Sequence, residues 1–204
     1  MANDPPHVSL RFANTARGRD DDPIATPAAL DAWLEATLPL GHAAESPSHD
    51  ADRRLPSPGG PSRTSLPEAR RLFDEAIRLR TAFAEALEAV RGRRSVPAPS
   101  LAVIERSLSA GRWRRSVATS GPALALESEP VPSSDPLARL SPLAADLIEL
   151  LSGADPDRLR TCADEACGRW FLDTSRGGRR RWCSMSTCGN RAKAERWRAR
   201  HRDG

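Results

Sequence analysis

Four cysteines stand within 27 residues of one another, and the 204-residue chain contains no others. They are Cys162, Cys167, Cys183 and Cys188, which gives the spacing C-x4-C-x15-C-x4-C. Two close pairs separated by a hairpin-sized gap can each supply two corners of a tetrahedral Zn²⁺ site. Because four thiolates leave no open coordination position, the spacing predicts a zinc ion that folds a small module and does not activate water.

Four cysteines can also form two disulfides or hold an iron–sulfur cluster. The first residues of the chain lack the basic and then apolar pattern of a secretory signal, so we expect a cytoplasmic protein whose thiols stay reduced. Zinc is therefore the favoured interpretation. His201 is interpreted as an exposed residue at a helix end, since the four thiolates already suffice.

Positive charge is concentrated in the same part of the chain. Between Arg158 and Arg202 there are 13 arginines or lysines and four acids, whereas the remainder carries 18 bases and 23 acids. Such asymmetry favours a polyanionic partner for the C-terminal segment. The predicted nucleic-acid contacts are Arg176, Arg179, Arg180, Arg181, Asn190, Arg191, Lys193, Arg196, Arg198 and Arg200.

Asn190 and Arg191 have two interpretations. Asparagine can pair with adenine and arginine with guanine when the start of a helix enters the major groove. Asn190 can instead cap the helix that follows Cys188. Both interpretations stay open on the sequence alone.

The residues around the cysteines predict a hairpin followed by a helix. Residues 169–172 and 180–182 are expected to pair as strands across a turn at 173–178, and residues 190–200 are expected to be helical. Trp197 is expected to face inward against this hairpin. Trp170 and Trp182 are expected to fill space beneath the hairpin, with stacking on unpaired bases as the alternative.

Three strings within this segment closely resemble the CGNR zinc-finger family. They are Phe171-Leu172-Asp173-Thr174-Ser175, then the run from Arg179 to Met185, then Cys188-Gly189-Asn190-Arg191-Ala192-Lys193. In that family the finger follows a larger domain called ABATE, which opens with a strand ending in Asn-Thr, and residues 10–15 look similar. The resemblance implies a bacterial transcription regulator, described as stress-induced, with the finger as its DNA-binding part.

The rest of the chain predicts mainly helices. Apolar residues recur with helical spacing from Leu72 to Val90, and Thr26-Pro27 is typical of a helix start. The expected elements are a strand at 8–12, helices at 27–38, 67–90, 100–110 and 137–151, a hairpin of 113–117 with 123–126 that pairs with the first strand, and a mobile loop at 45–67.

We therefore predict an α+β fold with two domains. Residues 1–155 form a helix-rich sensing or dimerising domain with a small antiparallel sheet, and residues 156–204 form a treble-clef-like four-cysteine zinc finger. The partner is DNA, with RNA as an alternative, and the resemblance leaves room for a small-molecule effector and a homodimer. A second hypothesis is an RNA- or protein-interaction adaptor that does not read DNA sequence.

Two classes of protein are not expected. No stretch approaches the ~20 apolar residues that a membrane span requires. Residues 1–155 contain no cysteine, no Gly-rich phosphate loop and no paired-acid motif, so we do not expect an enzyme.

Overall fold

The computed structural model describes residues 7–18, 20–38, 65–120, 123–131 and 133–201. The predicted loop at 45–67 falls almost entirely outside them. The elements in chain order are α1 (Val8–Ala13), η1 (Asn14–Ala16), α2 (Pro27–Thr37), α3 (Leu66–Arg91), α4 (Ala98–Ala110), β1 (Arg112–Ser120), β2 (Ala123–Val131), η2 (Pro136–Leu140), α5 (Ser141–Gly153), η3 (Pro156–Arg158), β3 (Leu159–Thr161), β4 (Trp170–Leu172), η4 (Met185–Gly189) and α6 (Asn190–Arg200). The α+β class is confirmed.

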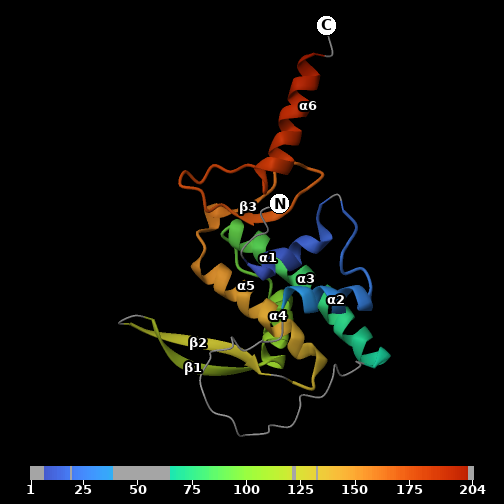
Figure 1. Ribbon diagram of the computed structural model, residues 1–204, viewed down its shortest axis with the longest axis vertical. Helices are drawn as coiled ribbons and strands as arrows, with labels where there is room; N and C mark the ends of the chain where they lie inside the picture. Colours follow the sequence, from blue (N-terminus) through green and yellow to red (C-terminus); the bar gives the residue numbers. More distant parts are fainter. Residues whose placement is uncertain (1–6, 19, 39–64, 121–122, 132, 202–204) are drawn as a thin grey trace, which may run out of the picture.

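Two parts of the molecule extend from a body of packed helices (Figure 1). The body contains α1 to α5, and the β1–β2 hairpin leaves it on one side. The cysteine-bearing segment covers one end of the body, and α6 projects from this segment away from the helices. None of the described helices is long and apolar enough to cross a membrane.

The 26-residue helix α3 is the centre of the body and packs against α1, α2, α4 and α5. Its buried side chains, Leu72, Ala76, Leu79, Phe83 and Leu87, recur at intervals of three or four residues, as predicted. A capping box opens the helix, because the Ser65 N–H donates to the Glu68 carboxylate at 2.9 Å. At ~1.5 Å per residue α3 is about 39 Å long, and its far end reaches β3.

The predicted strand at residues 8–12 is wrong, since these residues begin α1. Asp146 of α5 accepts hydrogen bonds from the Ser9 N–H at 2.8 Å and from the Ser9 hydroxyl, which satisfies the free end of this short helix. Leu10 and Phe12 are both fully buried among the other helices. Apolar residues two positions apart over five residues are too short a pattern to distinguish a strand from a tightly packed helix.

The predicted hairpin exists as β1 and β2, which pair antiparallel with Trp113 opposite Pro130 and Val117 opposite Leu126. Within the described residues these two strands pair only with each other. The expected third strand is missing from this sheet because residues 8–12 are helical.

The strand pairing predicted around the cysteines is also wrong. β4 pairs antiparallel with β3, with Leu159 opposite Leu172 and Thr161 opposite Trp170, and residues 180–182 form no strand. The backbone of residues 180–182 bonds elsewhere, because the Arg181 carbonyl accepts from the Ala163 N–H at 2.7 Å. The segment therefore lies beside the first cysteine pair.

The finger and the helical body share buried contacts. Leu159 and Trp170 belong to the same hydrophobic core as Leu10, Phe12 and the inner face of α3. The side chain of Asn14 bonds both backbone groups of Trp170, and the Arg17 guanidinium donates to the Gly168 carbonyl at 2.8 Å. A domain boundary at residue 155 stays a prediction, but the two parts pack as neighbours.

Candidate metal centre and basic surface

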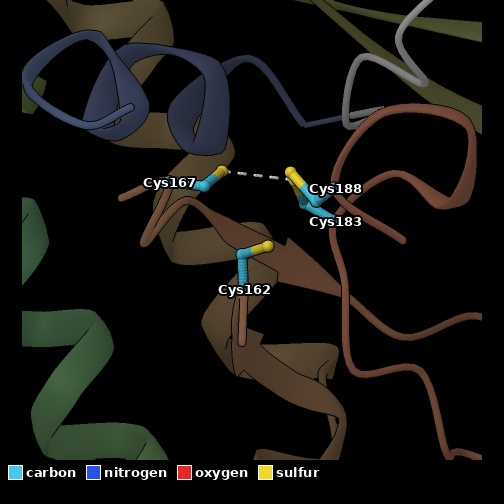
Figure 2. A group of neighbouring side chains, drawn as sticks. All are labelled: Cys162, Cys167, Cys183 and Cys188. Carbon is cyan, nitrogen blue, oxygen red and sulfur yellow. Dashed lines mark hydrogen bonds between the residues drawn. The ribbon is translucent and has the colours of Figure 1, made fainter. Parts of the chain in front are cut away.

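The four cysteine sulfur atoms gather at one point (Figure 2). All four Sγ atoms lie within 4.8 Å of one another, with 3.6 Å between Cys167 and Cys183 and 3.9 Å between Cys183 and Cys188. A tetrahedral ion with Zn–S bonds of ~2.3 Å needs sulfur atoms about 3.8 Å apart. The donor set and its spacing therefore fit a four-coordinate zinc ion.

A tight turn brings the first two cysteines together. The Cys167 and Gly168 N–H groups both donate to the Asp164 carbonyl, at 2.9 and 3.0 Å. Gly168 has a φ of +54°, which favours glycine over residues with a Cβ. This turn carries the chain from Cys162 at the end of β3 back toward β4.

A single π-helical turn, η4, brings the second pair together. The Gly189 N–H donates to the Ser184 carbonyl five residues earlier at 3.0 Å, and the Ser184 hydroxyl caps the turn at the Thr187 N–H. A Cβ at Gly189 would lie 2.5 Å from the Met185 sulfur, so a larger residue there would have to displace the exposed Met185 side chain. The four-residue spacing between Cys183 and Cys188 thus follows from a wide turn that leads directly into α6.

The environment of the thiols favours a bound cation. Cys162, Cys167 and Cys188 are buried, and all four cysteines are free thiols. Burial and the neighbouring thiols raise the pKa of Cys183 to about 12, and burial likewise raises the pKa of Cys188. Burial would also raise the pKa of Cys162, but hydrogen bonds from backbone N–H groups and the other thiols hold it below its usual value. Sulfur atoms packed so closely need a metal cation to become thiolates together.

Asn190 and Arg191 join α6 to the cysteine turns. The Asn190 side-chain amide donates to the Ser186 carbonyl at 3.1 Å. The Arg191 guanidinium pairs with Asp164 at 2.6 Å, and only 29% of its side chain is exposed. Both contacts hold the start of α6 against the cysteine turns, which agrees with a positioning role for the two residues. Contact of these residues with bases stays a prediction.

The other predicted cationic residues lie on the surface. Arg179, Arg180 and Arg181 line a shallow hollow of about 390 Å³ together with Trp182 and Met185. Exposed side chains are also found at Arg176 on the preceding turn and at Lys193, Arg196, Arg198 and Arg200 along α6. Their role as nucleic-acid contacts stays a prediction.

The three tryptophans of this segment differ in position. Trp170 is fully buried, so base stacking on it is excluded in this structure, and Trp182 is half-buried beside the hollow. The inward orientation predicted for Trp197 is wrong, because its side chain is 56% exposed and stacks on His201 with ring centroids 4.5 Å apart. Every side chain of α6 from Lys193 to Arg200 is exposed. This part of the helix therefore has no face that a hairpin covers.

Sequence reasoning missed the residues that attach the finger to the body. Asn14 and Arg17 bond the backbone around β4, and the guanidinium groups of Arg17 and Arg91 lie over the Trp170 ring at 5.2 and 5.4 Å from its centroid. The Asn14-Thr15 pair was the one available signal, and it gave no indication of its partner.

Two family models match the chain. The ABATE model, described as "Putative stress-induced transcription regulator", matches residues 6–154, and the CGNR zinc-finger model matches residues 158–201. A search of curated proteins gives no match. The two matches agree with the resemblance found in the sequence.

Proposed function

Because the chain belongs to the ABATE family and carries a CGNR zinc finger, we propose that it is a zinc-dependent transcription regulator that binds DNA through the finger. The observation that carries the proposal is the placement of a cationic, exposed helix directly after a cluster of four thiols. The cluster holds the start of α6 in place, and α6 with the adjacent arginines supplies the binding surface.

In this proposal Cys162, Cys167, Cys183 and Cys188 hold the ion. Zinc supplies a structural cross-link between the turn that brings Cys162 and Cys167 together and the turn that brings Cys183 and Cys188 together. The four sulfur ligands close its coordination shell, so the proposal assigns the protein no catalytic step.

The exposed part of α6 supports contact with a duplex. Eleven residues at ~1.5 Å each make a helix about 16 Å long, and the major groove of B-DNA, about 12 Å wide, admits a helix of this kind. Arginine and lysine side chains on two sides of the helix can reach the phosphates that flank the groove. The arginines at 176 and 179–181 extend the same positive surface toward the loop.

An isolated helix of this length is marginal in water, which also supports a role in binding. Arg191 and Asn190 hold its first turn, and every side chain from Lys193 to Arg200 is exposed. A partner that contacts α6 would stabilise it.

The helical body is proposed to sense a signal or to dimerise. The buried bonds between Asn14 and Trp170 support this role, because they give a change in α1 a direct route to the finger. A small-molecule effector and a homodimer remain part of the proposal.

An RNA-binding adaptor is the second candidate. It is favoured by the hollow beside Trp182 and Met185, because an indole ring next to three arginines suits an unpaired base and its phosphate. In this case single-stranded or structured RNA would compete with duplex DNA for the finger.

The test is selection of bound sequences from random duplex DNA by the full-length, zinc-loaded protein, with structured RNA as competitor at fixed salt. An enriched motif that resists RNA competition supports a DNA-binding regulator. Uniform, salt-sensitive binding that RNA displaces would support the adaptor instead, and no binding to either nucleic acid would refute both.

A further inference from the structure

A second hollow, of about 340 Å³, lies between the helical body and the finger. Its lining includes Arg91 from the end of α3, Arg160 from β3, and Arg180 and Arg181 from the segment before Cys183. Among the described residues that line it, Asp157 is the only acidic one, and its carboxylate pairs with Arg93 at 3.0 Å. Four arginines and one acidic residue therefore line this hollow, although Glu88 pairs with Arg91 and the buried Asp173 carboxylate lies 3.9 Å from Arg160.

The arginines of this hollow retain hydrogen-bond donors. Arg160 donates through Nη2 to the Gly178 carbonyl at 2.8 Å and through Nε to the Asp157 carbonyl at 3.2 Å. Arg180 donates through Nη2 to the Cys183 carbonyl at 2.7 Å. Each guanidinium carries five N–H donors, so bonds of this kind orient the group and leave other donors free. Arg91 pairs with Glu88 at 2.7 Å, but both side chains are about 40% exposed and such pairs contribute little.

The buried ring of Trp170 also fixes Arg91, whose guanidinium carbon lies 5.4 Å from the ring centroid. Cation–π contact of this kind holds the charge at the boundary between α3 and the finger.

The two hollows share lining residues. Arg180 and Arg181 line both of them, so the same two arginines border the hollow beside Trp182 and the hollow next to α3. A phosphate backbone held by these two arginines would lie beside both hollows.

We infer that the hollow between α3 and the finger binds a backbone phosphate of the nucleic acid, with Arg91 contributed by the helical body and Arg160, Arg180 and Arg181 by the finger. The inference rests on the proposed function and adds a contact from outside the family's zinc finger. It follows that the ABATE part of the chain contributes directly to nucleic-acid affinity.

The experiment compares two charge-removing variants on the same helix in the full-length, zinc-loaded protein. Arg91→Gln removes the charge at the hollow, and Arg71→Gln removes an exposed charge 20 residues away, about 30 Å along α3. The dissociation constant for a labelled 20-base-pair duplex is measured by fluorescence anisotropy over a range of salt concentrations.

The logarithm of the association constant falls linearly as log salt rises, and loss of one phosphate contact makes this line less steep by ~0.9. It also weakens binding about three- to tenfold near 0.1 M salt. We expect this for Arg91→Gln, and we expect Arg71→Gln to stay within about twofold of the wild type. Equal slopes for the two variants, with zinc content unchanged, would overturn the inference while leaving the proposed function standing.

Two further measurements keep the inference testable. If Arg91→Gln loosens the finger, Arg91→Lys serves as a second variant because it keeps the charge, and it is expected to restore the wild-type salt dependence. A salt dependence as shallow as that of Arg91→Gln would overturn the inference. If the wild type binds no nucleic acid, the proposed function fails, and titration with pyrophosphate tests the hollow alone. Binding of pyrophosphate that Arg91→Gln abolishes would support the site, and absence of binding would overturn it.

Discussion

The side chain of Asn14 forms two hydrogen bonds with the backbone of Trp170, a residue 156 positions later in the chain. Its Nδ2 donates to the Trp170 carbonyl at 2.9 Å, and its Oδ1 accepts from the Trp170 N–H at 2.7 Å. Both residues are buried. The asparagine thus substitutes for a neighbouring strand at the edge of β4 and holds the finger against the body.

Replacement of Asn14 by alanine leaves two buried backbone groups of Trp170 without partners. We expect a loss of about 2 to 4 kcal/mol in the free energy of unfolding measured in urea. Asn190→Ala is the matched control, because its single bond to the Ser186 carbonyl is exposed and its loss is expected to cost below about 1 kcal/mol. Equal effects of the two substitutions would contradict a structural role for the Asn14 contact.

Arg191 and Asp164 form a partly buried ion pair next to the cysteine cluster. Because outer-sphere contacts orient metal ligands, we expect Arg191→Ala and Asp164→Ala each to reduce zinc retention against a chelator by about tenfold. The double variant is expected to behave like either single one, as the two side chains act together. If only Arg191→Ala changed the selected DNA sequence and zinc retention stayed normal, base reading by Arg191 would be the better account.

Asp173 is a fully buried carboxylate that closes the loop before the third cysteine. Burial alone would raise its pKa, but hydrogen bonds from Ser175 and the Arg180 N–H, with the charge of Arg160, hold the pKa below its usual value. Since the pKa in the folded state is lowered, the carboxylate stabilises the fold at pH values above its unfolded pKa of ~3.9, and this contribution is lost as pH falls through the folded value.

Asp173→Asn should therefore destabilise the protein by about 1 to 3 kcal/mol near pH 7 and progressively less below pH ~4. Unfolding in urea at a series of pH values measures this difference. Asp155→Asn provides the control, since Asp155 is exposed and accepts one bond, from the Asp157 N–H. A difference between wild type and Asp173→Asn that persists unchanged in acid would show that the carboxylate charge is not responsible.

Truncation of Trp170 and truncation of Trp197 should differ widely in their effect on the free energy of unfolding. Trp170→Ala removes a fully buried ring and is expected to cost about 3 to 5 kcal/mol. Trp197→Ala removes an exposed ring and should change the free energy of unfolding by less than about 0.5 kcal/mol. Comparable destabilisation by the two variants would mean that α6 packs against the body.

Features set by local pattern were predicted well from the sequence. The Thr26 cap, the period of α3 and the spacing of the cysteines each depend on residues close together in the chain. The fold class followed from these elements. Patterns of this kind identify a helix or a metal cluster because neighbouring residues alone specify it.

Features set by distant partners were missed. Residues 8–12 became helical because Asp146 caps α1 and the body buries both faces. β4 pairs with β3, and the Arg181 carbonyl accepts a hydrogen bond from the Ala163 N–H, so residues 180–182 lie away from β4 in the backbone pairing. Trp197 stayed exposed because no segment lies over α6, and no short pattern could have indicated that Asn14 would bond Trp170.

The central claim is that one zinc ion, held by the four cysteines, fixes the shape of the basic surface. Native mass spectrometry of the freshly reduced, full-length chain tests it most directly. We expect a folded species that carries one Zn²⁺ per chain, and we expect Cys188→Ser to lose that mass. A compact wild-type chain without metal, or one that carries iron and sulfide, would contradict the account.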